Sequence, residues 1–287
     1  MSEPTCPHPA VVVRADGEHC RAEFETPAEA CALCRGAEGL SVREADGYEV
    51  FRPCARRKAR SRIDLFNAAR VGRRYVEATF ESYRPANRSQ ADALDAATFW
   101  TAQHGLRRGA RGGLLFWGPV GTGKTHLALS VFRALTLHHG VPCRFVDYGN
   151  LLMDLKRSFR AEAGTSEAAI MLPLVEVDVL VVDELGKGRD TEWELTVLDD
   201  LISRRYNADR VTLFTTNLSA TPRPNRGAGL NPSYDQRRAE SAVAGGGTLE
   251  ERLDARIYSR LCEMCDFIHV DGGDFRRTDL AISRKRQ

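Results

Sequence analysis

One stretch of eight residues constrains this chain more than any other. Residues 118–125 read Gly-Pro-Val-Gly-Thr-Gly-Lys-Thr and match the phosphate-loop pattern G-x-x-x-x-G-K-[ST] at every fixed position. The apolar run Gly113–Trp117 predicts a short buried strand before it, and apolar residues at helical spacing in 126–139 predict a helix after it. Because a phosphate loop joins a strand to a helix, the motif and its flanks together predict a nucleotide site.

The residue types in this loop suit a phosphate. Gly121 and Gly123 let the backbone turn its N–H groups toward an anion, and the following helix N-terminus adds partial positive charge. We expect Lys124 to reach the β- and γ-phosphates and the Thr125 hydroxyl to ligate Mg²⁺. The predicted nucleotide-binding residues of the loop are Gly118, Pro119, Val120, Gly121, Thr122, Gly123, Lys124 and Thr125.

A second chemical feature ends another apolar run. Residues 177–184 read Val-Asp-Val-Leu-Val-Val-Asp-Glu, a pattern typical of a buried central strand in a parallel sheet. Its carboxylates emerge at the carboxyl end of the strand, where open α/β sheets bind ligands. We expect Asp183 to hold Mg²⁺ through water and to be part of the nucleotide site. Glu184 is expected to orient and polarise an attacking water.

The rest of this half of the chain alternates between strand and helix patterns. Predicted strands cover 143–147, 210–217 and 266–271, and predicted helices cover 91–104, 151–161, 193–207 and 249–265. Residues 219–247, rich in Pro, Gly, Asn and Arg, predict a long surface loop. Asn217 ends a strand, where its amide either bonds the attacking water or the γ-phosphate, or caps the next turn. Its position favours the catalytic role.

Composition excludes some classes of protein. The net charge is +2, so contacts with nucleic acid require local basic patches. The sequence lacks an apolar run of the ~20 residues that a membrane span needs, and its N-terminus lacks the layout of a signal peptide. We therefore expect a cytoplasmic protein without a membrane partner. In that reducing compartment, the eight cysteines favour metal binding or burial over disulfides.

Residues 1–62 hold five of the cysteines and show little apolar periodicity. Cys31 and Cys34 have the spacing of a zinc knuckle, and Cys54 follows a predicted hairpin, so three thiolates can surround one Zn²⁺. A module this small has little core, which favours a metal. The alternative is a set of thiols without metal. For the fourth ligand, Cys20 is the first choice, and the others in order are His19, Cys6 and His8.

Two basic segments are candidates for contact with nucleic acid. The run Arg56–Arg62 is either a solvated helix face or a phosphate contact. The predicted helix at 151–161 carries three cations and a ring, a mixture that suits single-stranded DNA. Those predicted DNA-binding residues are Lys156, Arg157, Phe159 and Arg160. The alternative there is a solvated face with one core phenylalanine.

The aromatic residues of 75–83 either pack on an adenine or anchor a linker, and the anchor is the safer interpretation.

Residues 70–280 resemble the AAA+ ATPases of the DnaC type, which are replicative-helicase loaders, and the related ATP-binding helpers of insertion-sequence transposases. The resemblance rests on the phosphate loop, on 156–160 with 164–166, on 179–184 and 215–217, and on 251–265 with 274–276. It implies that Asn217 is sensor 1, that Arg260 is the finger reaching a neighbour's ATP, and that Arg276 is sensor 2. The cysteine-rich end is similar to the zinc-bearing, helicase-contacting end of some loaders.

Two features depart from that family's pattern. Cys54 is not followed by a second cysteine two positions on, and the segment 219–247 is longer than expected. The first leaves the fourth zinc ligand open. The second weakens the alignment of the arginines beyond the segment, so Arg256, one turn before Arg260, is the substitute finger.

The expected fold is an α/β AAA+ P-loop domain with a central parallel sheet (111–287). We expect a zinc module (1–62) and a linker with an amphipathic helix (63–110) to precede it. The expected activity is ATP hydrolysis, with ATP, Mg²⁺ and Zn²⁺ bound. The expected function is loading a replicative DNA helicase onto single-stranded DNA, with self-association through the ATP site. The alternatives are an ATP-dependent helper of a transposase and an ATP-sensing regulatory protein.

Overall fold

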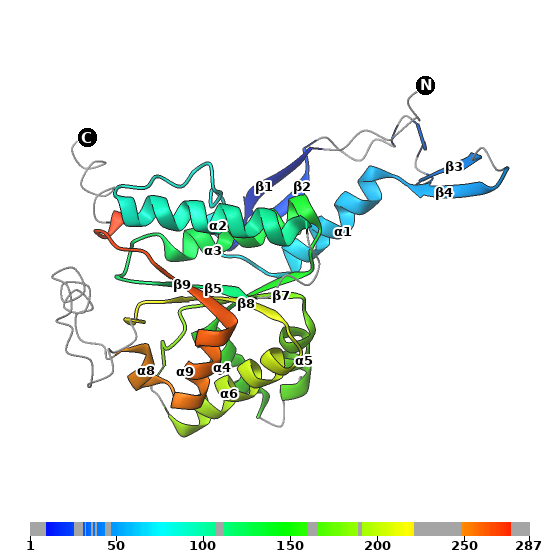
Figure 1. Cartoon of the computed structure of the whole chain (residues 1–287). Helices are drawn as coiled ribbons and strands as arrows, with labels where there is room; N and C mark the ends of the chain where they lie inside the picture. The colour runs from blue at the N-terminus through cyan, green and yellow to red at the C-terminus, as the bar shows by residue number, and fades with distance from the viewer. Residues whose placement is uncertain are drawn as a thin grey trace.

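The computed structural model describes residues 10–25, 31, 33–35, 37, 39–43, 47–106, 112–159, 166–188, 191–220 and 248–276. Its centre is a parallel sheet of five strands in the order β6-β7-β8-β5-β9 (Figure 1). The strands are β5 (Gly113–Trp117), β6 (Cys143–Asp147), β7 (Val179–Asp183), β8 (Val211–Thr216) and β9 (Cys265–His269). The predicted α/β class with a central parallel sheet is therefore confirmed.

The sheet has an apolar core on each face because side chains alternate along each strand. In β5, Leu114 and Phe116 belong to one core, while Leu115 and Trp117 belong to the other. In β7 the same alternation separates Val179 and Val181 from Leu180 and Val182. Strands buried on both faces need continuous apolar sequence, which is what made them recognisable.

Helices cover both faces of the sheet (Figure 1). One face carries α1 (Ala55–Ala68), α2 (Arg88–Leu106), α3 (Lys124–Arg133) and the π-helical turn η2 (Ala134–His139). The other carries α4 (Tyr148–Ser158), α5 (Glu167–Glu176), α6 (Glu192–Asn207), α8 (Leu249–Arg252) and α9 (Ala255–Met264). Side-chain oxygens of Asp147, Ser166 and Thr191 accept backbone N–H groups at the starts of α4, α5 and α6, which fixes where those helices begin.

The predicted single helix over 249–265 is wrong in detail. The structure divides it into α8 and α9, because Leu253 is extended and the Asp254 carboxylate caps a new helix by accepting the Arg256 N–H at 2.8 Å. Thr248 and Glu251 form a capping box that starts α8. The last residue of the prediction, Cys265, already belongs to β9.

The N-terminal residues divide into two parts. The antiparallel hairpin of β1 (Val11–Asp16) and β2 (His19–Phe24) packs against α1 and the 3-10 helix η1 (Arg73–Tyr75), and Cys20 and Ala22 enter the same core as Phe132. The hairpin of β3 (Gly39–Arg43) and β4 (Glu49–Pro53) extends away from the body (Figure 1). Part of the predicted zinc module is thus packed against the body that contains the parallel sheet, and the domain boundary at residue 62 stays a prediction.

A buried arginine joins α6 to β8 and to the end of α5. Arg205 in α6 is 0% exposed, and its guanidinium donates to the Thr212 hydroxyl at 2.8 Å and to the Leu174 and Val177 carbonyls at 2.6 and 2.9 Å. Carbonyls at the end of α5 would otherwise be buried without partners, so this cation completes their hydrogen bonding.

Among the described residues, no helix is long and apolar enough to span a membrane.

Candidate nucleotide-binding site

The phosphate loop lies between β5 and α3, as its motif requires, and other parts of the chain close on its glycines. Gly121 and Gly123 have φ of 80° and 96°, in the left-handed region. A Cβ on Gly121 would lie 2.0 Å from the Asp274 carboxylate, and one on Gly123 would lie 2.6 Å from the Tyr83 ring. The Tyr83 hydroxyl donates to the Thr122 carbonyl at 3.2 Å. Both glycines are therefore required by backbone conformation and by close packing.

Lys124 is the charged group of this loop. Its ammonium donates to the carbonyl oxygens of Gly118 at 2.8 Å and Pro119 at 2.5 Å. Burial lowers the pKa of Lys124 to about 8; Asp183 opposes this shift, and the nearby Arg276 adds to it. A phosphate entering the loop would supply the negative charge that the buried ammonium needs, so the loop is arranged for an anion.

Asp183, at the end of β7, accepts hydrogen bonds from two threonines. Thr125 and Thr215 donate to the same carboxylate oxygen at 2.9 and 2.5 Å. Thr215 in turn accepts the backbone N–H of Glu184 at 3.0 Å. Burial raises the pKa of Asp183, and the two hydroxyls oppose that shift. The structure thus brings together the two predicted magnesium residues, Thr125 and Asp183, and adds Thr215, which joins the strand ends.

Glu184 and Asn217 lie at the same edge of the sheet. Both line the cavity beside the loop, as does Arg276. Glu184 has a φ of 58°, unusual for a residue with a side chain, and its carboxylate forms an ion pair with Lys187. The left-handed turn directs the chain away from β7 immediately after Asp183, which leaves two adjacent carboxylates at the strand end.

A cavity of about 600 Å³ joins these groups. Its walls come from the segment before α2, the phosphate loop, the ends of β7 and β8, and the residues after β9, including Arg74, Tyr75, Tyr83, Glu184, Asn217 and Arg276. The volume falls in the range of about 300–1,000 Å³ typical of small-molecule sites. A glycine cradle, a buried ammonium and a hydroxyl–carboxylate pair fit ATP in the loop, with Mg²⁺ at Thr125 and Asp183.

Sequence reasoning missed part of this wall. The Tyr83 hydroxyl and the Gln90 amide both donate to the Thr122 carbonyl of the loop, at 3.2 and 3.3 Å. Arg74 and Tyr75 also reach the cavity. The aromatic residues before the phosphate loop are the available sequence signal. Burial of Tyr83 agrees with their role as anchors, but Tyr75 and Tyr83 also line the cavity.

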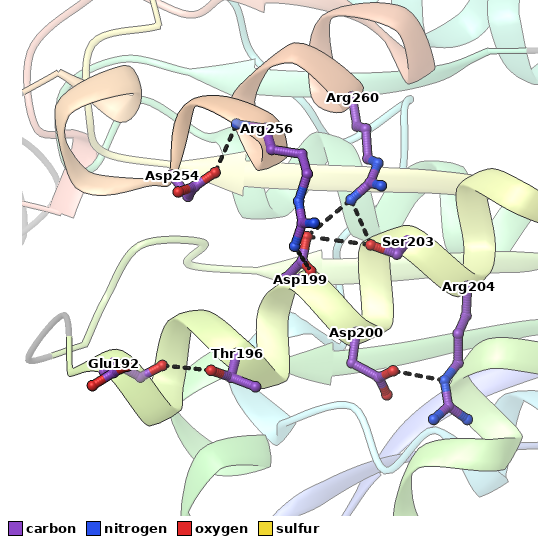
Figure 2. A network of polar contacts seen from close by, with 9 residues as sticks. All are labelled: Glu192, Thr196, Asp199, Asp200, Ser203, Arg204, Asp254, Arg256 and Arg260. Atoms are coloured by element: carbon purple, nitrogen blue, oxygen red, sulfur yellow. Dashed lines mark hydrogen bonds and ion pairs between the residues drawn. The ribbon is translucent and has the colours of Figure 1, made fainter.

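Arg260, the predicted finger, lies on α9 and faces α6 (Figure 2). Its guanidinium donates to Asp199 at 2.9 Å and to the Ser203 hydroxyl at 2.6 Å, and Arg256 bonds the other oxygen of the same carboxylate. Arg260 is not among the described residues that line the cavity of its own chain. The prediction that Arg260 reaches a neighbour's ATP therefore stays a prediction.

Three predicted zinc ligands come together outside the sheet. The sulfur atoms of Cys31, Cys34 and Cys54 are buried and lie within 4.8 Å of one another. The Arg35 N–H donates to the Cys31 carbonyl at 2.6 Å and closes a tight turn around the first two cysteines. Cys54 immediately precedes α1. Three converging thiols suit a zinc ion, which thiolates bind in tetrahedral sites.

The prediction that Cys20 is the fourth ligand is wrong. Cys20 lies in β2, packs in the core on one face of the sheet, and directs its thiol to the Gly72 carbonyl at 3.3 Å. Burial raises the pKa of Cys20, which disfavours the thiolate that binds metal. His19 neighbours it in the same hairpin, whereas Cys6 and His8 lie outside the described residues.

The predicted DNA-binding helix is tied to α6. Lys156 forms an ion pair with the buried Glu194 at 3.0 Å and lies 5.0 Å above the Trp193 ring, which Phe159 meets edge-on. Arg157 pairs with Asp154 at the surface, at 3.2 Å. Arg160 lies outside the described residues. Lys156 and Phe159 thus both contact Trp193, but Phe159 is 57% exposed and is not the core phenylalanine of the alternative interpretation. The DNA contact predicted for this helix stays a prediction.

The fold and the site define a P-loop nucleotide-binding protein with a central parallel sheet. A profile of the family described as IstB-like ATP binding protein matches residues 39–222, and the chain belongs to this family. The match covers the phosphate loop, Asp183, Glu184 and Asn217.

Individual relatives agree with that family. The chain is 30% identical over 152 residues to the replicative helicase loader DnaC of Escherichia coli K12, a match spanning 53% of this chain and 60% of the loader. The crystal structure of a DnaC helicase loader superposes with a TM-score of 0.53 at 28% identity, covering 69% of this chain and 99% of that one. The structure of DnaI, at 20% identity, shares the fold with a TM-score of 0.51 over 70% of this chain and 92% of that one.

Proposed function

We propose that this protein is an ATP-hydrolysing AAA+ protein of DNA replication that loads a replicative DNA helicase onto single-stranded DNA. The observation that carries the proposal is a cavity lined by the phosphate loop, Glu184 and Asn217 in a chain that is 30% identical over 152 residues to a replicative helicase loader. Because the match spans 60% of that loader, its activity and partners come to this chain as part of the proposal.

Each residue of the site has a role in this proposal. Lys124 and Arg276 neutralise charge on the phosphates, and the two threonines hold Asp183 in place. Thr125 and Asp183 would hold Mg²⁺, which would neutralise further phosphate charge. Glu184 leaves its ion pair with Lys187 and accepts a proton from the water that attacks the γ-phosphate, while Asn217 orients that water.

The neighbouring subunit completes the site. Arg260 stabilises charge on the transferring phosphoryl group of the adjacent subunit's ATP, so hydrolysis depends on self-association. Asp199 and Ser203 hold the guanidinium at the α6–α9 surface before assembly. Nucleotide turnover then releases the partner protein or the DNA.

The cysteine hairpin is the proposed partner-binding end. The β3–β4 hairpin extends from the body (Figure 1), and its Tyr48 and Phe51 are exposed. The buried Cys31, Cys34 and Cys54 form a cluster against which Leu40 of β3 packs. Zinc bound by these thiols would hold the hairpin rigid. A rigid apolar projection of this kind suits contact with a helicase, and single-stranded DNA is proposed to bind near Arg157 and Arg160 on the body.

The test uses the full chain and the replicative helicase of the same host. We expect the two proteins to co-purify with ATP, and we expect the helicase to be delivered to single-stranded DNA coated with binding protein. The Glu184→Gln variant should hold the complex in its ATP state. A helicase that neither binds the chain nor reaches DNA faster in its presence would overturn the loader proposal.

A second candidate has its own support. The family that matches residues 39–222 is described as IstB-like, which favours the alternative of an ATP-dependent transposase helper. Parallel capture with a transposase encoded beside the gene separates the two, because a helper binds the transposase and a loader binds the helicase. An ATP-sensing regulator, the third alternative, would bind ATP without turning it over.

A further inference from the structure

The segment 71–83, which lies between α1 and α2, follows one wall of the nucleotide cavity. Two side chains of α3 hold its backbone there: Arg133 donates to the Val76 carbonyl at 2.9 Å, and His126 contacts the Thr79 carbonyl at 2.9 Å. The hydroxyl of Tyr83, which belongs to the segment, donates to the Thr122 carbonyl of the phosphate loop at 3.2 Å. The segment is thus fixed to the same elements that hold the phosphates.

The 3-10 helix η1 lies near the start of this segment, and two of its residues line the cavity. Arg74 and Tyr75 line it, whereas Arg73, directly before them, is not among its described lining residues. Tyr75 and Thr125 line the same cavity, and the Tyr75 hydroxyl lies within hydrogen-bond reach of the Thr125 side chain. Tyr75 therefore lies beside the hydroxyl–carboxylate pair, at the magnesium end of the site.

The position of Arg74 follows from that of Tyr75. The Arg74 guanidinium lies 4.6 Å from the centroid of the Tyr75 ring. A guanidinium stacked on a ring keeps its N–H donors in the guanidinium plane, where they can form paired hydrogen bonds with phosphate oxygens. Arg74 thus adds a cation at the end of the cavity occupied by Thr125 and Asp183.

We propose that Arg74 contacts the γ-phosphate of ATP bound by its own chain and makes the site discriminate ATP from ADP. This inference rests on the proposed ATP site and not on the identity of the partner protein. Lys124 serves the β- and γ-phosphates together, so it cannot by itself distinguish the two nucleotides strongly. A second cation reaching the terminal phosphate adds binding energy that ADP cannot gain.

The contact has a mechanical consequence. The backbone of this segment is bonded to the β1–β2 hairpin: the Cys20 N–H donates to the Val71 carbonyl at 2.7 Å, and the Arg73 N–H donates to the Glu18 carbonyl at 2.8 Å. A phosphate contact at Arg74 is therefore one residue from a backbone bond to the N-terminal hairpin. The presence of the γ-phosphate thereby constrains the N-terminal part of the chain.

The test compares nucleotide affinities of the full chain by titration calorimetry with ATPγS and with ADP, both with Mg²⁺. Arg74→Ala should weaken ATPγS binding about tenfold or more and change ADP binding less than about twofold. Arg73→Ala is the matched control and should leave both affinities unchanged. Arg74→Lys should restore part of the loss, because a lysine keeps the charge without the paired donors.

Each result is decisive. Unchanged ADP binding also shows that Arg74→Ala is folded. Equal losses for both nucleotides, or no loss for either, would overturn the γ-phosphate contact. A chain that shows the expected Arg74 pattern but loads no helicase would support the inference and overturn the loader proposal. A wild-type chain that binds neither nucleotide would overturn the ATP site and this inference together.

Discussion

Arg260 in α9 donates to Asp199 in α6 at 2.9 Å, and the same carboxylate also binds Arg256 (Figure 2). The two arginines differ in their surroundings: the Arg260 side chain is 23% exposed and also donates to Ser203, whereas the Arg256 side chain is 66% exposed. Packing thus fixes the direction of Arg260 more firmly than that of Arg256. A finger that has to meet a neighbour's phosphate benefits from being held in advance.

The finger role predicts complementation between inactive subunits. Arg260→Ala should bind ATP almost normally and hydrolyse it roughly 10³-fold more slowly, because the finger stabilises the transferring phosphoryl group. Mixed with Lys124→Ala, which keeps Arg260 but loses its own nucleotide, it should regain part of the activity. Phosphate release measured across mixing ratios decides this.

Arg256→Ala is the control for that experiment, since Arg256 shares Asp199 and lies one turn earlier on the same helix. It should keep most of the activity. If Arg256→Ala is the inactive variant and Arg260→Ala is not, the finger is Arg256. Absence of recovery in mixtures shown to co-assemble would rule out Arg260 acting in trans.

The two carboxylates at the end of β7 predict separate effects. Glu184→Gln should retain ATP and slow hydrolysis by on the order of 100-fold, because it removes the proton acceptor but keeps the shape. Lys187→Ala is the control, since it removes the ion-pair partner of Glu184 and leaves the carboxylate. Single-turnover hydrolysis with bound ATP measures both variants. Hydrolysis by Glu184→Gln at the wild-type rate would remove Glu184 from the mechanism.

The cysteine cluster predicts about one zinc per full-length chain when it is purified without chelator. Cys34→Ser should lose most of the metal, because its sulfur lies within 4.8 Å of the other two. Cys20→Ser should keep the metal, since Cys20 packs in a different core. Elemental analysis of the three proteins is the measurement. Metal-free wild-type protein, or equal loss in both variants, contradicts this assignment.

The sequence predicted the sheet well because its signals are local. The apolar runs of β5 and β7 and the phosphate-loop motif each depend on adjacent residues, and the structure places them as expected. The β1–β2 hairpin, with its two-residue loop Gly17-Glu18, does not follow from the sequence prediction, because residues 11–24 show little apolar alternation. The helix break at Asp254 was missed because the apolar spacing continues across it.

The candidate site was predicted where chemistry follows from motif, and missed where it follows from tertiary contact. Asp183 and Glu184 are recognisable at a strand end. Thr215 joins the site through the neighbouring strand, 32 residues from Asp183. The segment 215–217 carries the family resemblance, but the hydrogen bond from the Thr215 hydroxyl to Asp183 follows only from the pairing of β7 with β8. Arg74 reaches the cavity from a linker without a motif. Such residues require the path of the chain to be known.

The buried Arg205 predicts a large effect on stability. Arg205→Leu should lower the free energy of unfolding by about 3–5 kcal/mol, because backbone carbonyls at Leu174 and Val177 lose a buried donor. Arg205→Lys should also destabilise, since one ammonium cannot replace the spread of bonds from a guanidinium. Urea unfolding measures both. A change below about 1 kcal/mol for Arg205→Leu would show that these carbonyls find other partners.

The last prediction separates DNA binding from packing on α4. Lys156 pairs with the buried Glu194 and lies over Trp193, so Lys156→Gln should reduce stability by about 1 kcal/mol, a modest value because the ammonium is half exposed. Arg157, in an exposed pair with Asp154, should contribute only a few tenths of a kcal/mol to stability. If this helix contacts phosphates, Arg157→Gln should weaken binding to single-stranded DNA and reduce the slope of log affinity against log salt by about 0.7.

Lys156→Gln should therefore change mainly the free energy of unfolding, measured in urea. Arg157→Gln should change mainly the salt slope, measured in a salt series of DNA-binding isotherms. Both remove one positive charge from neighbouring positions of one helix, so a general loss of charge would change both slopes equally. A reduced slope for Arg157→Gln alone places a phosphate contact at Arg157. Equal slopes in wild-type protein and Arg157→Gln would remove this helix from the DNA site and favour the basic run Arg56–Arg62 of α1, which is partly exposed.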